Sequence, residues 1–473
     1  MMKALTIIRL KNMKKGVVSN MKQKIWGWAL MLVVIVLIVG CSSETKGNDS
    51  EETNDDTTDA DQDKVSNETD DPEEVNVSLM IHWGEKEFEN FFRKHIEEAL
   101  PHIKLTYIQS RDQNDIEENF AKGLVPDLVM GSNFHMYEEL DLARDQTPLI
   151  EKYGIDFDRF DPNVVETLRN ASPEGEILAL PLFQDDGMMG YNKDIFDAFG
   201  VPYPEDNMTW DEAIELGKQL VGERDGKVYR GIWPDKDQLS QVSATLIDGD
   251  TNEPNILNNK ELHLFLERLQ TIFNIPGNLP EMDSVEELAE FMYNESGSVD
   301  LLEEYALVPG VGFHGILPRE VDEGLNADWV TYPTWGGEYP EHIPNKLSNS
   351  IFVSSQSENP DAAFEVIHYL LSDDYQKQSV SEGRLSPLIS EEVQNEFGKG
   401  MEHYDRLKEK NWETQFSIPG APMPKLSPYE NPIRKDLMIN AYQRLLEGDD
   451  LNTVIRIMDE EAQNMIEDLA GKE

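Results

Sequence analysis

Short apolar runs alternate with amphipathic stretches along the first part of the folded chain. Residues 75–83, VNVSLMIHW, predict a strand, and residues 88–100 carry their apolar side chains on one helical face. HIKLTYIQ at 102–109 predicts a second strand, IEENFAKGL at 116–124 a second helix, and PDLVMGSNF at 126–134 a buried strand. Strands that alternate with helices predict a largely parallel α/β sheet, with ligands bound beyond the C-terminal strand ends.

A polar break interrupts the next apolar pair. EILALPLF at 176–183 and MMGY at 188–191 predict strands, and Asp185, Asp186 and Gly187 separate them. A polar break between two buried strands is what we expect where a chain crosses from one lobe to another.

Two helices with predicted capping residues follow this break. Asn192 is a predicted N-cap for KDIFDAF, and Gly200 supplies its left-handed C-terminal cap. Thr209 and Glu212 form a capping box for the next helix. Trp210 lies inside that box, so we expect it to pack in the core.

The N-terminal region predicts export. Residues 1–24 hold basic and no acidic residues, and an apolar run of about 16 residues then reaches Cys41, the single cysteine. A spanning helix needs about 20 residues, so we favour a secretory signal over an uncleaved anchor. IVGC resembles the bacterial lipoprotein box, in which this cysteine is lipidated. Translation could start at Met1 or at Met21.

Composition limits the classes of function. The 473 residues predict two or three domains, and 39% hydrophobic residues can fill their cores. Residues 42–76 are acidic and polar, which predicts a disordered tether. A net charge of −51 disfavours nucleic acid as a partner and indicates a solvated, acidic surface.

A resemblance to a known family rests on ILALPLFQDDGMMGYNKDIFDAFGVPYPEDNMTWDEAIELGKQL, with VPDLVMGSNF, YPTWGG and ENPDAAFEVIHYLLSDDYQKQSVSEGRLSPL in the expected order. These segments resemble the extracellular solute-binding proteins of ABC importers, in the carbohydrate branch that includes maltose-binding protein. The order of the segments, across nearly 400 residues, carries the resemblance more than any single motif.

The resemblance implies an α/β fold of the type II periplasmic-binding-protein kind, with two lobes, a hinge and a ligand cleft between the lobes. The signal would span 1–40, and lipidated Cys41 with the tether 41–76. The lobes would be 77–183 with 338–384, and 187–332 with 388–473. The crossings would lie near 184–186, 333–337 and 385–387.

The resemblance also implies the ligand-binding residues, since carboxylates accept sugar hydroxyls and aromatic rings cover sugar faces. The expected contacts are Trp83, Glu85, Lys86, Asn133, Phe134, Asp185, Trp233, Trp335 and Tyr429. For each aromatic residue, packing in the core is an equally good interpretation. The chain departs from the family pattern at 304–315, which leaves Phe313 and His314 as further candidates.

No sequence motif of an enzyme is present: HExxH, GxSxG, the phosphate loop and the dinucleotide glycine pattern are all missing. We therefore expect no catalysis, cofactor or metal. The resemblance and the lipoprotein signal imply a monomeric, lipid-anchored binding protein of a Gram-positive cell membrane. It would capture a sugar and deliver it to ABC permease subunits. A polyamine or other cation as solute, or a sensory role at a membrane receptor, remain the alternatives.

Overall fold

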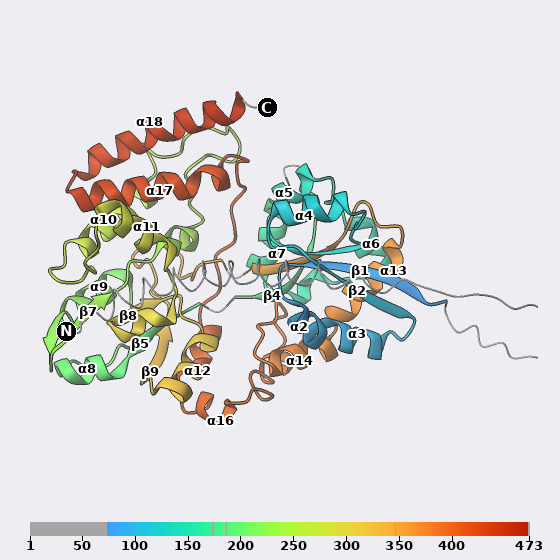
Figure 1. Ribbon diagram of the computed structural model, residues 1–473, viewed down its shortest axis with the longest axis horizontal. Helices are drawn as coiled ribbons and strands as arrows, with labels where there is room; N and C mark the ends of the chain where they lie inside the picture. Colours follow the sequence, from blue (N-terminus) through green and yellow to red (C-terminus); the bar gives the residue numbers. More distant parts are fainter. Residues whose placement is uncertain (1–72, 173–174, 186, 346, 472–473) are drawn as a thin grey trace, which may run out of the picture. The chain divides into compact units, whose positions relative to one another are not determined.

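The computed structural model describes residues 73–172, 175–185, 187–345 and 347–471. The chain from Asp70 onward forms one compact unit. It contains two five-stranded sheets, each covered by helices (Figure 1). The first sheet and its helices are named the first lobe, and the second sheet and its helices the second lobe. The predicted signal, Cys41 and most of the tether lie outside the described residues.

The first sheet has the order β2-β1-β3-β10-β4. Its strands are β1 (Val75–Ile81), β2 (Ile103–Gln109), β3 (Leu128–Gly131), β4 (Leu180–Gln184) and β10 (Leu347–Val353). β1 is parallel to β2 and β3, as the alternating pattern predicts, but β10 is antiparallel to both of its neighbours. β10 enters from the second lobe at the edge where β3 and β4 end, so it must run the other way.

The first lobe has two apolar cores, one on each face of its sheet. Neighbouring residues such as Leu79 and Met80, or Ile351 and Phe352, belong to separate apolar clusters because successive side chains point to opposite faces. α4, α5 and α7 supply Ile116, Phe134 and Val164 to one face, and Figure 1 shows them on the side away from α2 and α3.

The helical segments of the first lobe complete these two layers. They are α2 (Glu85–Phe88), η1 (Glu89–Arg93), α3 (Lys94–Ala99), α4 (Gln113–Ala121), α5 (Phe134–Glu139), α6 (Thr147–Tyr153), η2 (Phe157–Arg159), α7 (Pro162–Asn170), α13 (Pro360–Leu370), α14 (Asp373–Ser381) and α15 (Glu391–Gln394).

The second sheet has the order β6-β7-β8-β5-β9. Its strands are β5 (Met188–Asn192), β6 (Gly222–Arg224), β7 (Lys227–Ile232), β8 (Tyr305–Pro309) and β9 (Ala327–Thr331). β7 and β8 are parallel, whereas β5 is antiparallel to β8 and β9. β5 follows the first crossing and therefore starts at the edge where β7, β8 and β9 end.

The helical segments of the second lobe lie around this sheet and in the C-terminal region. They are α8 (Lys193–Phe199), α9 (Trp210–Lys218), η3 (Lys236–Val242), α10 (Lys260–Phe273), α11 (Val285–Asn294), η4 (Val299–Glu303), α12 (Phe313–Glu323), α16 (Tyr404–Leu407), η5 (Trp412–Phe416), α17 (Glu430–Glu447) and α18 (Leu451–Ala470).

The predicted helix ends are confirmed. The Asn192 side chain accepts hydrogen bonds from the Asp194 and Ile195 amides, and Gly200 ends α8 at φ 66°. The capping box of α9 is complete, and Trp210 is fully buried. The local signals of this segment therefore match its tertiary structure.

The crossings extend further along the chain than expected. His342, placed beyond the second crossing by the sequence, still accepts a hydrogen bond from Gln241 of the second lobe at 2.8 Å. Leu385 and Ile389, which follow α14, both bond to the first lobe. The Leu385 carbonyl accepts from the Gln184 amide at 2.9 Å, and the Ile389 amide donates to the Arg159 carbonyl at 3.0 Å. Residues 385–389 thus remain on the first lobe, and the third passage follows them.

Candidate functional site

A polar pocket opens at the C-terminal edge of the first sheet. Its volume is about 520 Å³. His82 follows β1, residues 110–113 follow β2, and residues 131–133 lie at the end of β3, while Asn349 lies near the start of β10. The full lining is His82, Ser110, Arg111, Asp112, Gln113, Gly131, Ser132, Asn133, Met136, Tyr137 and Asn349. This is the edge at which an α/β sheet of this kind binds its ligands.

Arg111 is held in place at the rim of this pocket. Its guanidinium donates to both carboxylate oxygens of Asp115, at 2.7 and 3.1 Å, and its amide donates to the same side chain. These hydrogen bonds lower the pKa of Asp115, so the pair stays ionised. Beside it lie the exposed side chains of Gln113, Ser132 and Asn133. Gln113 Nε2 donates to Glu117 at 3.1 Å and Asn133 Oδ1 accepts from the Met136 amide at 3.4 Å, and their other polar atoms face the pocket edge with the Ser132 hydroxyl.

His82 adds a group that both donates and accepts. Burial of its ring lowers its pKa, so the imidazole is neutral at neutral pH, with one nitrogen donating and the other accepting. The ring lies edge-on to Trp83, with 5.8 Å between the centroids. A neutral imidazole can donate to one solute hydroxyl group and accept from another, which suits a hydroxylated solute.

The second lobe presents two carboxylates at the corresponding edge of its sheet. Asp235 and Asp237 lie just after β7, Asp235 as the N-cap of η3 and Asp237 in its first turn. Asp235 is buried, accepts hydrogen bonds from Ser296 and Tyr332, and caps η3 through the Asp237 amide at 3.1 Å. Its carboxylate is therefore committed to holding the structure.

Asp237 is different, because its side chain is exposed to solvent although neighbouring protein desolvates the carboxyl group. Burial, followed by the nearby Asp235 carboxylate, raises the pKa of Asp237 to about 7. This is a carboxyl group available to a solute from the second lobe.

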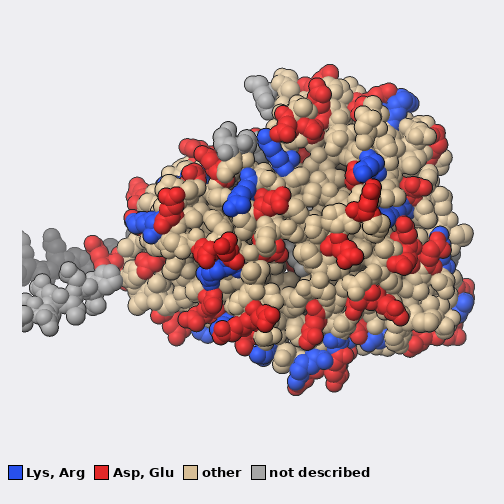
Figure 2. Space-filling view, turned by 180° about the vertical axis from the view of Figure 1, so that it is seen from behind, with Lys and Arg blue, Asp and Glu red and all other residues tan. Residues whose placement is uncertain are grey.

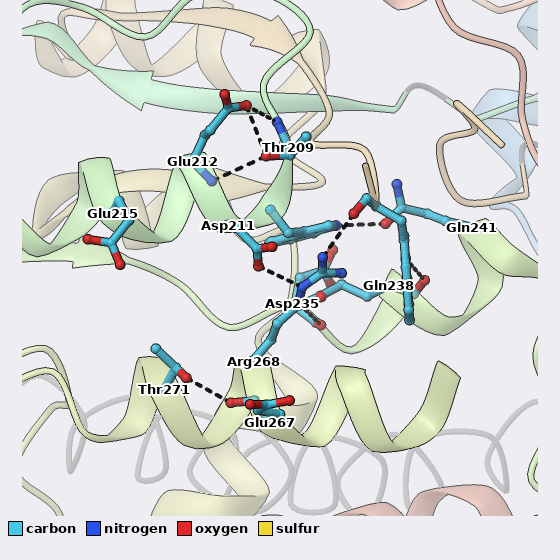
Figure 3. A network of polar contacts seen from close by, with 12 residues as sticks. Thr209, Asp211, Glu212, Glu215, Asp235, Gln238, Gln241, Glu267, Arg268 and Thr271 are labelled. Atoms are coloured by element: carbon cyan, nitrogen blue, oxygen red, sulfur yellow. Dashed lines mark hydrogen bonds and ion pairs between the residues drawn. The ribbon is translucent and has the colours of Figure 1, made fainter. Parts of the chain in front are cut away.

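A polar network joins η3 to α9 and to the second crossing (Figure 3). The Gln241 amide donates to the Pro333 and His342 carbonyls at 2.7 and 2.8 Å, and accepts from the Trp210 indole at 2.8 Å. Arg268 joins Asp211 at 3.1 Å to the Trp335 carbonyl at 2.9 Å. The second crossing and η3 are thereby bound together.

Of the predicted contacts, Asn133 lies in the pocket lining and Asp185 is exposed at the first crossing. Trp83 lies close by, but protein groups already cover its ring. Phe183 stacks at 5.9 Å between centroids, and the Arg384 guanidinium lies 4.5 Å from the ring centre. The half-buried Trp83 is part of an aromatic cluster beside the crossings.

Other predicted contacts are core residues instead. Trp233 and Trp335 are 0% and 3% exposed, and Phe134 is 8% exposed within the core beside α5. Trp233 packs edge-on against Phe291 and Tyr305, and the Trp335 indole donates to the Gln238 carbonyl at 2.8 Å. A buried ring has no open face, which corrects the expectation of a ligand contact at these three positions.

The remaining predicted residues lie apart from the pocket lining. Glu85 and Lys86 are exposed on the first turn of α2, and Tyr429 is half-buried against the core just before α17. The candidates on the departing segment also pack, since Phe313 is buried edge-on to Phe397 at 4.9 Å. His314 reaches the Gly383 carbonyl at 3.2 Å.

Sequence reasoning missed several lining residues. The polar run SRDQ, 110–113, follows a strand that the sequence predicts, so position alone could have indicated it. Asn349 could not be found this way, because the direction of β10 depends on the second crossing. Asp235 and Asp237 follow β7, whose place beside β8 is set by long-range pairing.

Two searches of the described residues give negative results. No group of three or more His, Cys, Asp or Glu side chains in this part of the chain could hold a metal ion. No helix within the same residues is long and apolar enough to cross a membrane.

The raised pKa of Asp237 predicts a pH dependence of stability. In the folded state the Asp237 carboxyl keeps its proton up to about pH 7, whereas its ordinary pKa is 3.8. The free energy of unfolding should therefore fall as the pH rises from about 4 to 7. Asp237→Asn should remove that decline. Chemical unfolding at a series of pH values from 4 to 8 measures this change in stability. Asp322→Asn, at an exposed position of α12, is the control. Equal pH profiles for the parent and Asp237→Asn would contradict the assignment.

Comparisons with known proteins identify the family of this chain. The sequence profile of the bacterial extracellular solute-binding protein family matches residues 84–377, more than half of the chain. A search of curated proteins finds no match.

Solved structures share the fold. A sugar transporter from Rhizobium etli, in an open conformation, has a TM-score of 0.63 and 20% identity over 82% of this chain and 99% of its own. The sugar-binding protein MalE from Xanthomonas citri has 0.62 and 17%, over 84% and 98%. An ABC substrate-binding protein from Listeria monocytogenes, in complex with cycloalternan, has 0.60 and 17%, over 84% and 99%. With its two-lobe α/β fold and the matched profile, the chain belongs to the bacterial extracellular solute-binding protein family.

Proposed function

We propose that this protein captures a carbohydrate between the first-lobe pocket and the Asp237 edge of the second lobe, for delivery to the permease of an ABC importer. The observation that carries the proposal is the polar lining of the pocket at the strand ends. The lining combines guanidinium, carboxylate, amide, hydroxyl and imidazole groups within one recess.

This lining suits a sugar in particular. Hydroxyl groups both donate and accept, and so do the Asn133 and Gln113 amides, the Ser132 hydroxyl and the neutral His82 ring. A carboxyl group such as Asp237 accepts hydroxyl donors in charge-assisted hydrogen bonds when it is ionised. The solved structures of similar fold support the same class, since they are a sugar transporter, a sugar-binding protein and a substrate-binding protein in complex with cycloalternan.

Capture would be coupled to delivery through the two-lobe fold. A solute that contacts both lobes favours their closed arrangement by its differential affinity for that state. Permease subunits in the membrane would recognise the closed form. The protein itself would act as a monomer and leave the solute chemically unchanged.

A cationic solute such as a polyamine is the second candidate. Asp112 in the pocket lining and Asp237 in the second lobe are the carboxylates that favour it. Figure 2, however, shows acidic side chains over the whole visible face rather than in one place. A general acidic surface that keeps an exported protein soluble accounts for this distribution.

Thermal unfolding with a panel of mono- and oligosaccharides, and with polyamines, tests the proposed solute class. A saccharide at 100 times its Kd should stabilise the protein by about 2.7 kcal/mol and raise Tm. A rise with polyamines alone would favour the second candidate. No rise with any saccharide would contradict carbohydrate capture.

Variants locate that binding. Loss of one or two hydrogen bonds in Gln113→Ala with Ser132→Ala should weaken saccharide binding by about tenfold or more, measured by calorimetry. Asn114→Ala is the matched control, because Asn114 is exposed beside Gln113 but is not part of the pocket lining. Equal losses in both variants would argue against this pocket.

The proposed attachment to the cell membrane rests on Cys41, which follows the apolar run of the signal. Lipidation at this residue would hold the protein on the extracellular face through the tether. Cys41→Ser should move most of the protein from the membrane fraction to the medium, which fractionation and immunoblotting measure. Unchanged membrane association of Cys41→Ser would contradict a lipid anchor at this residue.

A further inference from the structure

An extended, proline-rich segment touches both lobes. Residues 418–425, IPGAPMPK, are named the strap here. They lie between η5 and α17, with Pro419, Pro422 and Pro424 spaced along them. Proline fixes the backbone and removes the N–H donor, so such a segment is stiff and relies on its carbonyl groups for hydrogen bonds.

Five successive strap carbonyls each accept a hydrogen bond. The donors are Ile343 N to Pro419 at 3.0 Å, Asn163 Nδ2 to Gly420 at 2.8 Å, Asn345 Nδ2 to Ala421 at 2.7 Å, Ser243 Oγ to Pro422 at 2.6 Å and Asn170 Nδ2 to Met423 at 2.8 Å. The Ala421 amide also donates back to the Ile343 carbonyl at 3.0 Å. The strap is therefore held along its whole middle.

One face of α7 supplies the contacts from the first lobe. Asn163, Thr167 and Asn170 are spaced at i, i+4 and i+7, which places them on the same side of a helix. Thr167 Oγ1 accepts from the Met423 amide and from Asn345 Nδ2, each at 2.9 Å. The helix, the strap and the second crossing meet at this hydroxyl.

Both ends of the strap belong to the second lobe. Before it, Thr414 donates to Asp206 at 2.9 Å, and the Lys410 ammonium donates to the Ala327 carbonyl. At its C-terminal end, Lys425 pairs with Asp250 of the second lobe at 2.9 Å. The segment thus starts on the second lobe, bonds to the first lobe and the crossing, and returns.

We propose that the strap is an additional interlobe connection that sets the resting angle of the hinge, with Asn163, Thr167 and Asn170 as its positioning residues. A rotation of the first lobe moves α7 relative to the anchored strap ends. That motion must break the α7 hydrogen bonds or distort a stiff segment. The inference depends on the two-lobe fold and not on the identity of the solute.

The distance between the lobes tests this proposal without any solute. The unit from residue 70 onward has its own cores and contains no cysteine, because Cys41 is the only one. Lys122→Cys and Lys227→Cys, both at exposed positions, place one spin label on each lobe. Electron–electron double resonance then measures the distribution of distances between the labels.

The strap variant combines Asn163→Ala, Thr167→Val and Asn170→Ala. The minor state of a two-state protein holds about 0.1–10% of the molecules. Loss of these hydrogen bonds should raise the fraction of molecules with distances outside the main peak by about tenfold. Glu166→Ala with Arg169→Ala is the control, since both residues are exposed on the same helix. Its distribution should match that of the parent.

Two results would overturn the proposal. In the first, the strap variant is folded but has the distance distribution of the parent. In the second, the Glu166 and Arg169 control shifts as much as the strap variant. If the triple variant does not fold, Ser243→Ala removes the second-lobe donor to the strap, and the same two outcomes apply to it.

Discussion

The connection between β4 and β5 constrains the rest of the structure. β4 ends at Gln184 and β5 begins at Met188, so four residue steps, about 14 Å at most, separate the two strand ends. The edge of the first sheet where β4 ends therefore lies close to the edge of the second sheet where β5 starts. The same geometry makes β5 antiparallel to β8 and β9, and the second crossing does the same for β10 in the first sheet. The β4–β5 connection therefore sets the direction of β5 and brings the binding edges of the two sheets close together.

Local signals in the sequence were sufficient for much of the fold. The Asn192 cap, the Gly200 cap and the Thr209 capping box act within a few residues, so their outcome does not depend on distant contacts. The apolar runs of β1 to β5 similarly identify buried strands. The direction of β10 and the length of the crossings depend on pairing between segments far apart in the chain, which periodicity does not encode.

The candidate site was less accessible to sequence reasoning. Residue type favoured tryptophans as sugar platforms, yet Trp233 and Trp335 fill the core, because a large apolar ring gains most from full burial. Position after a strand was the better guide, as Asn133 and the 110–113 run show. Asp237 and the strap became visible only when the partners of η3 and α7 were known.

Hydrogen–deuterium exchange with and without the bound saccharide shows whether one solute contacts both sheet edges. We expect slower exchange around residues 110–113 and 131–133 of the first lobe, and around residues 235–241 of the second lobe, at the same saccharide concentration. Protection confined to one lobe, or located away from these strand ends, would contradict capture between the two edges.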